Sequence, residues 1–140
     1  MQTATPTTDP TSRPAASEPP DGPARTASRY LQAFYSGDFD RARAVVADDF
    51  SFEGPFLQVQ GKDAFFAGAE GLRPIVRGHR LLRQWEDGSD VCSVYEAQIV
   101  TPVGNGPVLI SEWHTVGDGL LTSGRVVFDT AAFRALVPQR

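Results

Sequence analysis

Helical and strand patterns are segregated along this chain, and this separation limits the available folds more than any other feature of the sequence. Apolar residues recur at helical spacing over residues 24–35 and 63–72, and a shorter helix is predicted over residues 38–46. One early strand is predicted at residues 50–53 and a closing helix at 130–136. The rest alternates between apolar runs and turn sequences, which predicts strands at residues 79–86, 91–100, 108–116 and 120–128. Helices grouped apart from a meander of strands predict an α+β fold rather than a parallel βαβ sheet.

The first 23 residues differ in composition from everything that follows. No Val, Ile, Leu or aromatic residue precedes Tyr30, and six of the 11 prolines lie at Pro6, Pro10, Pro14, Pro19, Pro20 and Pro23. A segment without large apolar groups cannot offset the entropy lost on ordering. We therefore predict a disordered leader over residues 1–23 and one folded domain over residues 24–140. Asp21 is the predicted cap of the first helix, and Pro23 suits its first position.

Charge and cysteine content argue against several classes of function. The chain has 17 acidic and 13 basic side chains, a formal net charge of -4, which disfavours binding to nucleic acid or anionic lipid. No apolar run reaches the length of a membrane span. The lone Cys92 cannot form an internal disulfide, and no Cys/His cluster has zinc spacing. We expect a cytoplasmic protein without a metal site or an organic cofactor.

Several short segments resemble the ketosteroid isomerases and SnoaL-like polyketide cyclases, which belong to the superfamily named for nuclear transport factor 2. The segments that carry the resemblance are Tyr30–Asp40, Val45–Phe50, Glu53–Pro55, Gly61 and Trp113–Leu120. The resemblance implies a cone-shaped domain, in which a strongly curved antiparallel or mixed sheet wraps around three N-terminal helices. It also implies an apolar pocket at the wide end and pairing of two copies through the outer sheet face. Many such proteins act on small apolar carbonyl compounds, but the superfamily includes non-enzymes too.

The resemblance carries one catalytic residue of the isomerases to this chain and leaves two without a match. Tyr30 matches the tyrosine that donates a hydrogen bond to the developing enolate. The catalytic aspartate of that family corresponds to Gly54, and its neutral acid corresponds to the region of Ser111. Steroid isomerisation by the isomerases' own mechanism is therefore not expected.

Two other carboxylates are candidates for the missing base. Simple alternation turns Glu53 away from the pocket, but a bulge at Gly54 would turn it inward. Tyr95 and Glu96 are neighbours on one strand, so only one of them faces the pocket, and the sequence does not choose between them. The predicted catalytic residues are Tyr30, Glu53 and Glu96.

The predicted strand over residues 108–116 has two faces, neither of them purely polar, which suits a sheet covered by helices on one side and a partner subunit on the other. We expect Ser111 and Trp113 to face the pocket and His114 to face outward. Arg125 is expected to pair with Glu112 on the outer face. The predicted pocket residues are Phe34, Phe52, Phe56, Phe66, Tyr95, Ser111 and Trp113.

Three functions remain open at this point. The first is acid–base isomerase or cyclase chemistry on a small apolar carbonyl, polyketide-like or terpenoid compound. The second is a module that binds a small ligand or assembles as a dimer without chemistry. The third is an epoxide hydrolase or dehydratase, although the Asp-Arg-Asp set of the related epoxide hydrolases cannot be placed around Arg125 and Asp129.

Overall fold

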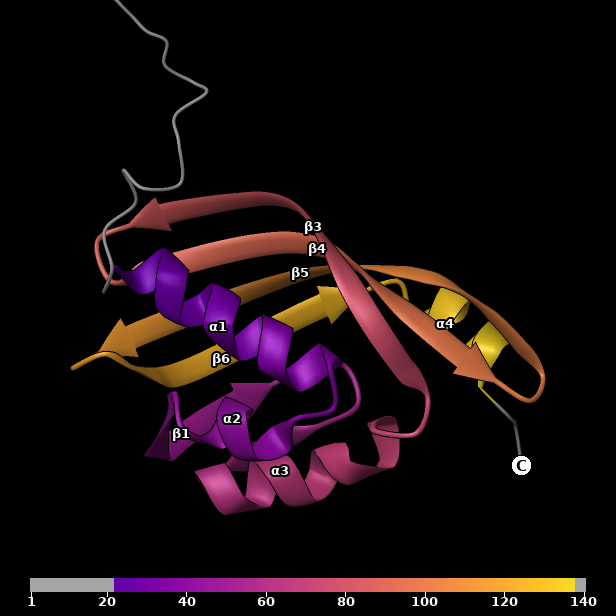
Figure 1. The fold of residues 1–140 in the computed structure, drawn as a ribbon, viewed down its shortest axis with the longest axis horizontal. Helices are drawn as coiled ribbons and strands as arrows, with labels where there is room; N and C mark the ends of the chain where they lie inside the picture. The colour runs from indigo at the N-terminus through magenta and orange to yellow at the C-terminus, as the bar shows by residue number, and fades with distance from the viewer. Residues whose placement is uncertain (1–21, 138–140) are drawn as a thin grey trace, which may run out of the picture.

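The structure of this protein, a computed structural model, describes residues 22–137 (Figure 1). The predicted cap Asp21 and nearly all of the predicted leader lie outside these residues. The helices are α1 (Pro23–Tyr35), α2 (Phe39–Arg43), α3 (Lys62–Ala69), a 3₁₀ turn η2 (Glu70–Leu72) and α4 (Thr130–Leu136). The strands are β1 (Val46–Glu53), β2 (Gln58–Gln60), β3 (Val76–Asp87), β4 (Asp90–Thr101), β5 (Gly104–Gly117) and β6 (Leu120–Phe128).

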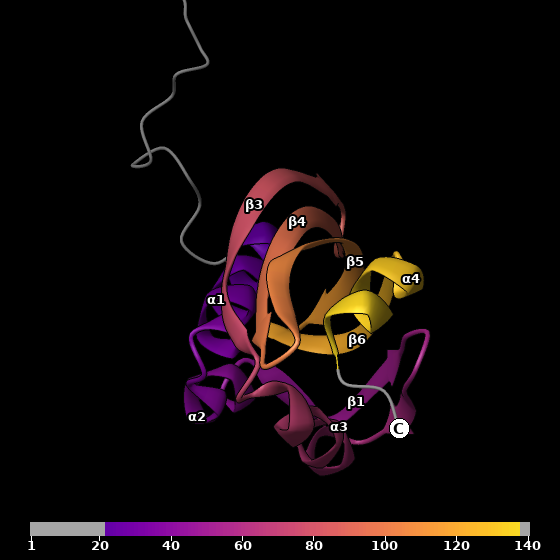
Figure 2. The same ribbon diagram turned by 90° about the vertical axis from the view of Figure 1, so that its right-hand side faces the viewer.

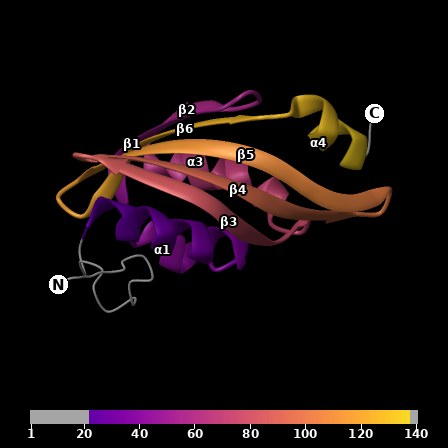
Figure 3. The same cartoon turned by 90° about the horizontal axis from the view of Figure 1, so that it is seen from above.

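The strands form one open six-stranded sheet in the order β2-β1-β6-β5-β4-β3. All neighbours are antiparallel except β1 and β6, which run parallel, so the sheet is mixed. Figure 2 shows the sheet curling around α1, and Figure 1 shows α2 and α3 beside β1. Figure 3 shows α4 at one end of the long strands, away from the start of α1. The prediction of an α+β fold with a curved sheet around three N-terminal helices is confirmed.

The first helix begins and ends where the local sequence permits. Gly22 occupies the N-cap position and Pro23 the first helical position. The chain turns after Tyr35 at Gly37, whose φ of 83° is accessible to glycine without strain. Asp38 then caps α2 by accepting a hydrogen bond from the backbone N–H of Arg41 at 3.1 Å.

The predicted second helix is too long at its C-terminal end. The helix α2 stops at Arg43, and Val46 instead begins β1, where it is paired with Leu121 of β6. A β-branched residue fits this buried strand position better than a helix end. The three-residue strand β2 was not predicted, because a segment this short carries too little pattern to recognise.

The phase of β5 decides which side chains reach the interior. Its inward side chains include Val108, Ile110, Glu112 and His114, all of which are buried. The alternate residues point to the opposite face of the sheet, where Trp113 is 47% exposed. This phase is opposite to the one expected from the sequence, and it brings a carboxylate and an imidazole into the core.

Candidate active site

A cavity of about 320 Å³ lies between α1 and the concave face of the sheet. Side chains from α3, the β1–β2 loop and α4 complete its wall. Its lining is mostly apolar and rich in rings, with Tyr30, Phe34, Tyr35, Phe52, Phe56, Phe65, Tyr95, Phe128 and Phe133. Among the described residues that line it, Glu112 is the only one with an ionisable carboxylate or a cationic side chain. An apolar cavity with a few polar groups is the usual form of a small-molecule site.

Glu112 enters this cavity from the middle of β5 and is only 4% exposed. The hydroxyl of Tyr95, on the neighbouring strand β4, donates a hydrogen bond to Glu112 Oε1 at 2.6 Å. The Tyr95 hydroxyl also lies 2.9 Å from the hydroxyl of Tyr35, on α1. Because the Tyr95 hydroxyl donates its hydrogen to Glu112, Tyr35 is the donor in the hydrogen bond between the two phenols. A carboxylate with one oxygen bound by a phenol keeps further lone pairs for a ligand proton.

The three tyrosines of the cavity keep their protons over the physiological pH range. Burial raises the pKa of Tyr30, Tyr35 and Tyr95 well above the ordinary value for a phenol, and the nearby charge of Glu112 raises it further. A neutral phenol is a hydrogen-bond donor. The cavity therefore holds three O–H donors beside one acceptor carboxylate.

Tyr30 is the phenol that is free to meet a ligand. Its side chain is 2% exposed and lines the cavity, and its hydroxyl forms no hydrogen bond with any of the residues 22–137. The ring packs against Phe34, with centroids 5.6 Å apart, and meets His114 edge-on at 5.2 Å. The ring is thus fixed while the hydroxyl keeps an unused donor, as an oxyanion site requires.

His114 lies behind Glu112 on the same face of β5 and is completely buried. Its Nε2 is 3.0 Å from Glu112 Oε2, which is ion-pair distance. The carboxylate oxygen is out of line with the ring N–H, so this contact lacks the angle of a hydrogen bond. The two oxygens of Glu112 therefore face different partners, the Tyr95 phenol and the His114 imidazole.

Three phenylalanines of the cavity lining pack together around the exposed side chain of Phe56. Phe56 of the β1–β2 loop is 48% exposed and contacts Phe128 and Phe133 with ring centroids 5.7 and 5.9 Å apart. The helix α4, which carries Phe133, is anchored by a hydrogen bond from the Thr101 hydroxyl to the Leu136 carbonyl. This aromatic part of the lining favours apolar ligands.

Five predicted site residues line the cavity, namely Tyr30, Phe34, Phe52, Phe56 and Tyr95. Phe66 does not line it. This side chain turns from α3 toward Phe39, with ring centroids 5.5 Å apart, and is part of the core. The prediction of Phe66 as a pocket residue is therefore wrong.

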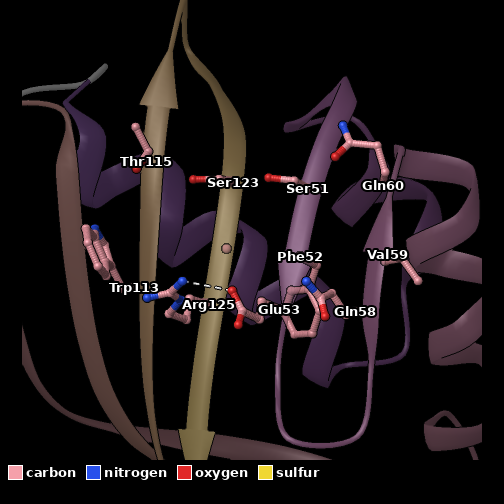
Figure 4. Close-up of a pocket in the computed structure, with 11 residues that line it drawn as sticks. Ser51, Phe52, Glu53, Gln58, Val59, Gln60, Trp113, Thr115, Ser123 and Arg125 are labelled. Atoms are coloured by element: carbon pink, nitrogen blue, oxygen red, sulfur yellow. Dashed lines mark hydrogen bonds and ion pairs between the residues drawn. The ribbon is translucent and has the colours of Figure 1, made fainter.

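The prediction that Ser111 and Trp113 face the cavity is also wrong. Both point outward from β5, opposite to Glu112 and His114. Figure 4 shows Trp113 beside Arg125 on the outer face of the sheet, where it lines a second depression of about 540 Å³ that we call the outer groove. This groove is lined by Ser51, Phe52, Glu53, Gln58, Val59, Gln60, Trp113, Thr115, Ser123, Gly124 and Arg125.

Neither predicted base reaches the cavity. Glu53 follows simple alternation and points outward, where its carboxylate accepts a hydrogen bond from Arg125 at 2.8 Å (Figure 4). The register shift of β1 falls between Val46 and Ser51 rather than at Gly54, so nothing reverses the phase of Glu53. Glu96 also points outward and pairs with Arg80 at 2.8 Å. The expected pairing of Arg125 with Glu112 is replaced by its pairing with Glu53.

The residues that the sequence analysis missed are Glu112, His114 and Tyr35. Val108 and Ile110 precede Glu112 and His114 at the same phase of the strand, a pattern of β-branched residues that marks an inner face. The expected phase followed instead from the correspondence of Ser111 with the neutral acid of the isomerases, which turned Ser111 and Trp113 toward the pocket. Tyr35 ends the apolar stripe of α1, which placed it on the buried side of the helix without indicating a polar partner.

Residues 22–137 contain no group of three or more His, Cys, Asp or Glu side chains arranged to bind a metal ion. No helix within these residues is long and apolar enough to cross a membrane.

This chain is similar in sequence and fold to known proteins. A family model described as a SnoaL-like domain matches residues 27–133. A crystal structure of a protein from Kribbella flavida DSM 17836 is 31% identical over 79% of this chain and 89% of that chain, with a TM-score of 0.70. A comparison with curated proteins gives no match.

Two less similar structures share the fold. An M. tuberculosis LEH-like epoxide hydrolase is 23% identical, with 81% of this chain and 88% of that chain covered and a TM-score of 0.70. A putative polyketide cyclase from Silicibacter sp. TM1040 is 19% identical, with 85% and 97% covered and a TM-score of 0.69.

Proposed function

Because this chain belongs to the SnoaL-like domain family, we propose that it is an acid–base enzyme in which Glu112 moves a proton and Tyr30 stabilises the resulting enolate. The observation that carries this proposal is a buried carboxylate on the wall of an apolar cavity, with the unused hydroxyl of Tyr30 in the same cavity. A general base and an oxyanion donor that face one cavity are the minimum needed for proton abstraction beside a carbonyl.

The proposed step is the enolisation of a bound carbonyl compound. A Glu112 oxygen takes a proton from the carbon next to the carbonyl. The C–H electron pair forms a carbon–carbon double bond, and the carbonyl π pair moves onto oxygen. The hydroxyl of Tyr30 donates a hydrogen bond to that oxygen. In a substrate with a further double bond next to that carbon, Glu112 returns the proton to the far end of the conjugated dienolate, which completes an isomerisation. Alternatively, the enolate carbon attacks a second carbonyl of the same molecule, the π pair of that carbonyl moves onto its oxygen, and this oxygen takes the proton from Glu112, which completes a cyclisation.

The cavity lining favours a neutral, largely apolar substrate. No Lys or Arg is among the described residues that line it, so a substrate carboxylate or phosphate would be buried without a counter-ion. The volume of about 320 Å³ suits a small molecule. These features support a small apolar carbonyl compound of polyketide-like or terpenoid type, and the fold shared with a putative polyketide cyclase is consistent with this class.

Epoxide hydrolysis has less support in this site. The related hydrolases use an Asp-Arg-Asp set, whereas here Arg125 pairs with Glu53 in the outer groove and Asp129 caps α4. Simple ligand binding remains the second candidate function. The observation in its favour is the mostly apolar cavity with a few polar groups, because such a cavity is sufficient to bind a small molecule.

We also propose that a second copy of this chain covers the outer face of the sheet. That face exposes the large side chains of Trp85, Leu109, Trp113 and Val127, which are between 47% and 60% exposed. Large apolar side chains gathered on one sheet face are typical of an interaction surface.

The proposed chemistry can be tested with a neutral ketone in D₂O. NMR would follow deuterium uptake beside the carbonyl of 1-indanone and of a small panel of aliphatic cyclic ketones. We expect the wild-type protein to accelerate exchange, and Tyr30→Phe to slow it by about 10²–10³-fold because one oxyanion donor is lost. Ser111→Ala, on the outer face, is the control and should leave the rate unchanged.

Failure of the wild-type protein to accelerate exchange of any ketone in the panel would contradict the enzymatic proposal. Native mass spectrometry of the purified protein then distinguishes the second candidate function. A small molecule retained by wild-type protein and lost on a substitution that fills the cavity would favour a ligand-binding module.

A further inference from the structure

The burial of His114 needs an explanation that packing does not provide. This side chain is completely buried, and neither ring nitrogen has a hydrogen-bond partner among the described residues. Buried polar groups normally find such partners, because leaving one unpaired is unfavourable. Glu112 Oε2 lies 3.0 Å from Nε2, at ion-pair distance. His114 is therefore oriented toward the proposed base and not toward the protein surface.

The absence of a side chain at Gly124 leaves a space in the sheet that holds the imidazole in this orientation. His114 is paired across the sheet with Gly124 of β6. A Cβ atom at position 124 would lie 3.2 Å from His114 Cδ2 and 3.1 Å from Phe50 Cζ, closer than most side-chain contacts. On the other side, the ring of Tyr30 meets the imidazole edge-on. The glycine thus makes room for the ring, and the aromatic neighbours restrict its rotation.

We propose that His114 is a positioning residue for Glu112, and this rests on the function proposed above. The imidazole lies at ion-pair distance from Oε2, and the Tyr95 hydroxyl donates a hydrogen bond to Oε1, so both oxygens of the carboxylate have a fixed neighbour and it keeps one orientation toward the cavity. His114 does not line the cavity and touches no substrate, so it acts through the carboxylate.

The charged and titratable partners of His114 are few. From its own strand it faces Glu112, and from α1 it faces Tyr30. Its cross-strand neighbours are Val91 on β4 and Gly124 on β6, which carry no ionisable side chain. The interaction with Glu112 therefore dominates the electrostatic environment of the imidazole, and removal of the carboxylate should be visible in the ring itself.

A measurement without substrate tests the pairing directly. The chain contains two histidines, so ¹⁵N-histidine labelling gives two sets of ring signals, and His79→Gln identifies which set belongs to His114. We expect Glu112→Gln to shift the ring-nitrogen signals of His114 and to leave those of His79 nearly unchanged. The matched control Glu53→Gln, on the outer face, should shift neither. Unchanged His114 signals in Glu112→Gln would overturn the pairing.

Kinetics with 1-indanone in D₂O separate positioning from packing. His114→Leu replaces the imidazole with an apolar side chain of similar size, so packing is largely preserved while the ring nitrogens are lost. We expect this variant to lower kcat by about 10- to 100-fold with little change in KM, which is the range seen for residues that orient metal ligands. His114→Gln keeps an N–H donor near Glu112 and should recover most of the loss. Wild-type kcat in His114→Leu would overturn the positioning role.

A glycine substitution disturbs the imidazole without removing any ionisable group. Gly124→Ala places a methyl group against the ring, so we expect shifted His114 signals and a lower kcat with unchanged KM. Gly71→Ala is the control, because a Cβ at position 71 meets no atom within 4 Å. If Gly124→Ala leaves both the His114 signals and kcat at wild-type values, Gly124 does not control the position of the imidazole.

The two proposals fail in different ways. If Glu112→Gln shifts the His114 signals but no ketone exchanges with wild-type protein, the pairing stands and the proposed function fails. If exchange depends on Glu112 but is indifferent to His114→Leu, the function stands and the positioning role fails.

Discussion

Both faces of the sheet carry glutamates, but those on the outer face are ion-paired at the surface and the one on the inner face is buried. On the outer face, Glu53 and Glu96 form ion pairs with Arg125 and Arg80, and the side chains of Glu53 and Arg125 are each at least half exposed. On the inner face, Glu112 is buried beside a phenol and an imidazole. Exposed ion pairs are screened by water and contribute about 0–1 kcal/mol. A buried carboxylate meets no such screening, so its few partners determine what it can do.

This contrast shows that the environment of a carboxylate, more than its presence near a family motif, identifies a candidate base. Glu53 lies one residue from the position of the isomerase aspartate, yet it faces water. Glu112 lies far from that motif in the sequence, yet it is the carboxylate that reaches the cavity.

The largest difference is expected between the inner and outer carboxylates. Glu112→Gln removes the proposed base and should reduce ketone deuteration by about 10²–10⁴-fold. Glu53→Gln and Glu96→Gln break only exposed ion pairs, so their exchange rates should remain near that of wild-type protein. NMR exchange rates measured side by side check this. A loss of rate in Glu53→Gln equal to that in Glu112→Gln would remove the distinction between the faces.

Two leucines offer the same comparison for stability. Leu121 of β6 is completely buried, and Leu121→Ala should lower the free energy of unfolding by about 2–5 kcal/mol because it leaves a cavity. Leu109 of β5 is 53% exposed, and Leu109→Ala should change the free energy by less than about 0.5 kcal/mol in the monomer. Urea unfolding at low protein concentration measures both. Equal losses would mean that the outer face is already covered within one chain.

The sequence predicted the fold more completely than it predicted the site. Segregated helical and strand patterns were enough for the α+β architecture, and alternation in Phe50–Glu53 correctly turned Phe52 inward and Glu53 outward. On β5 both faces carry apolar residues, so alternation alone could not choose between them. The choice depends on contacts distant in sequence, such as the space that Gly124 leaves for His114 and the phenol that Tyr95 offers to Glu112.

The apolar outer face gives a prediction about assembly. Trp113 is exposed beside Arg125, and Trp113→Ala should weaken self-association by at least about 2 kcal/mol if this tryptophan lies at the centre of the interface. Sedimentation equilibrium of wild-type and variant protein measures the difference. Val103→Ala, in an exposed turn outside the outer groove, is the matched control. A monomeric wild-type protein at high concentration would contradict the proposed dimer.

The smallest expected effect is the pH dependence contributed by His79. Its partial burial lowers the pKa below the ordinary 6.5, against a smaller opposing influence of Glu112. The unfolded chain therefore binds more protons than the folded chain between the two pKa values, and stability should fall as the pH drops below about 6.5. Because the ring is only half buried, the loss should stay below about 1 kcal/mol.

Denaturant unfolding between pH 5 and 8, with His79→Gln for comparison, checks this sign. Below about pH 6.5 the free energy of unfolding should decline less in the variant than in wild-type protein. A larger decline in the variant would show that protonated His79 stabilises the fold.

The position of a bound ketone tests the central claim most directly, because the claim concerns which face of the sheet holds the ligand. In a crystal structure of the protein with 1-indanone, the ring should occupy the inner cavity. Its carbonyl oxygen should lie about 2.6–3.2 Å from the Tyr30 hydroxyl, with the adjacent carbon facing Glu112. A ketone bound instead in the outer groove beside Trp113, or in the cavity with its carbonyl turned away from Tyr30, would contradict the account.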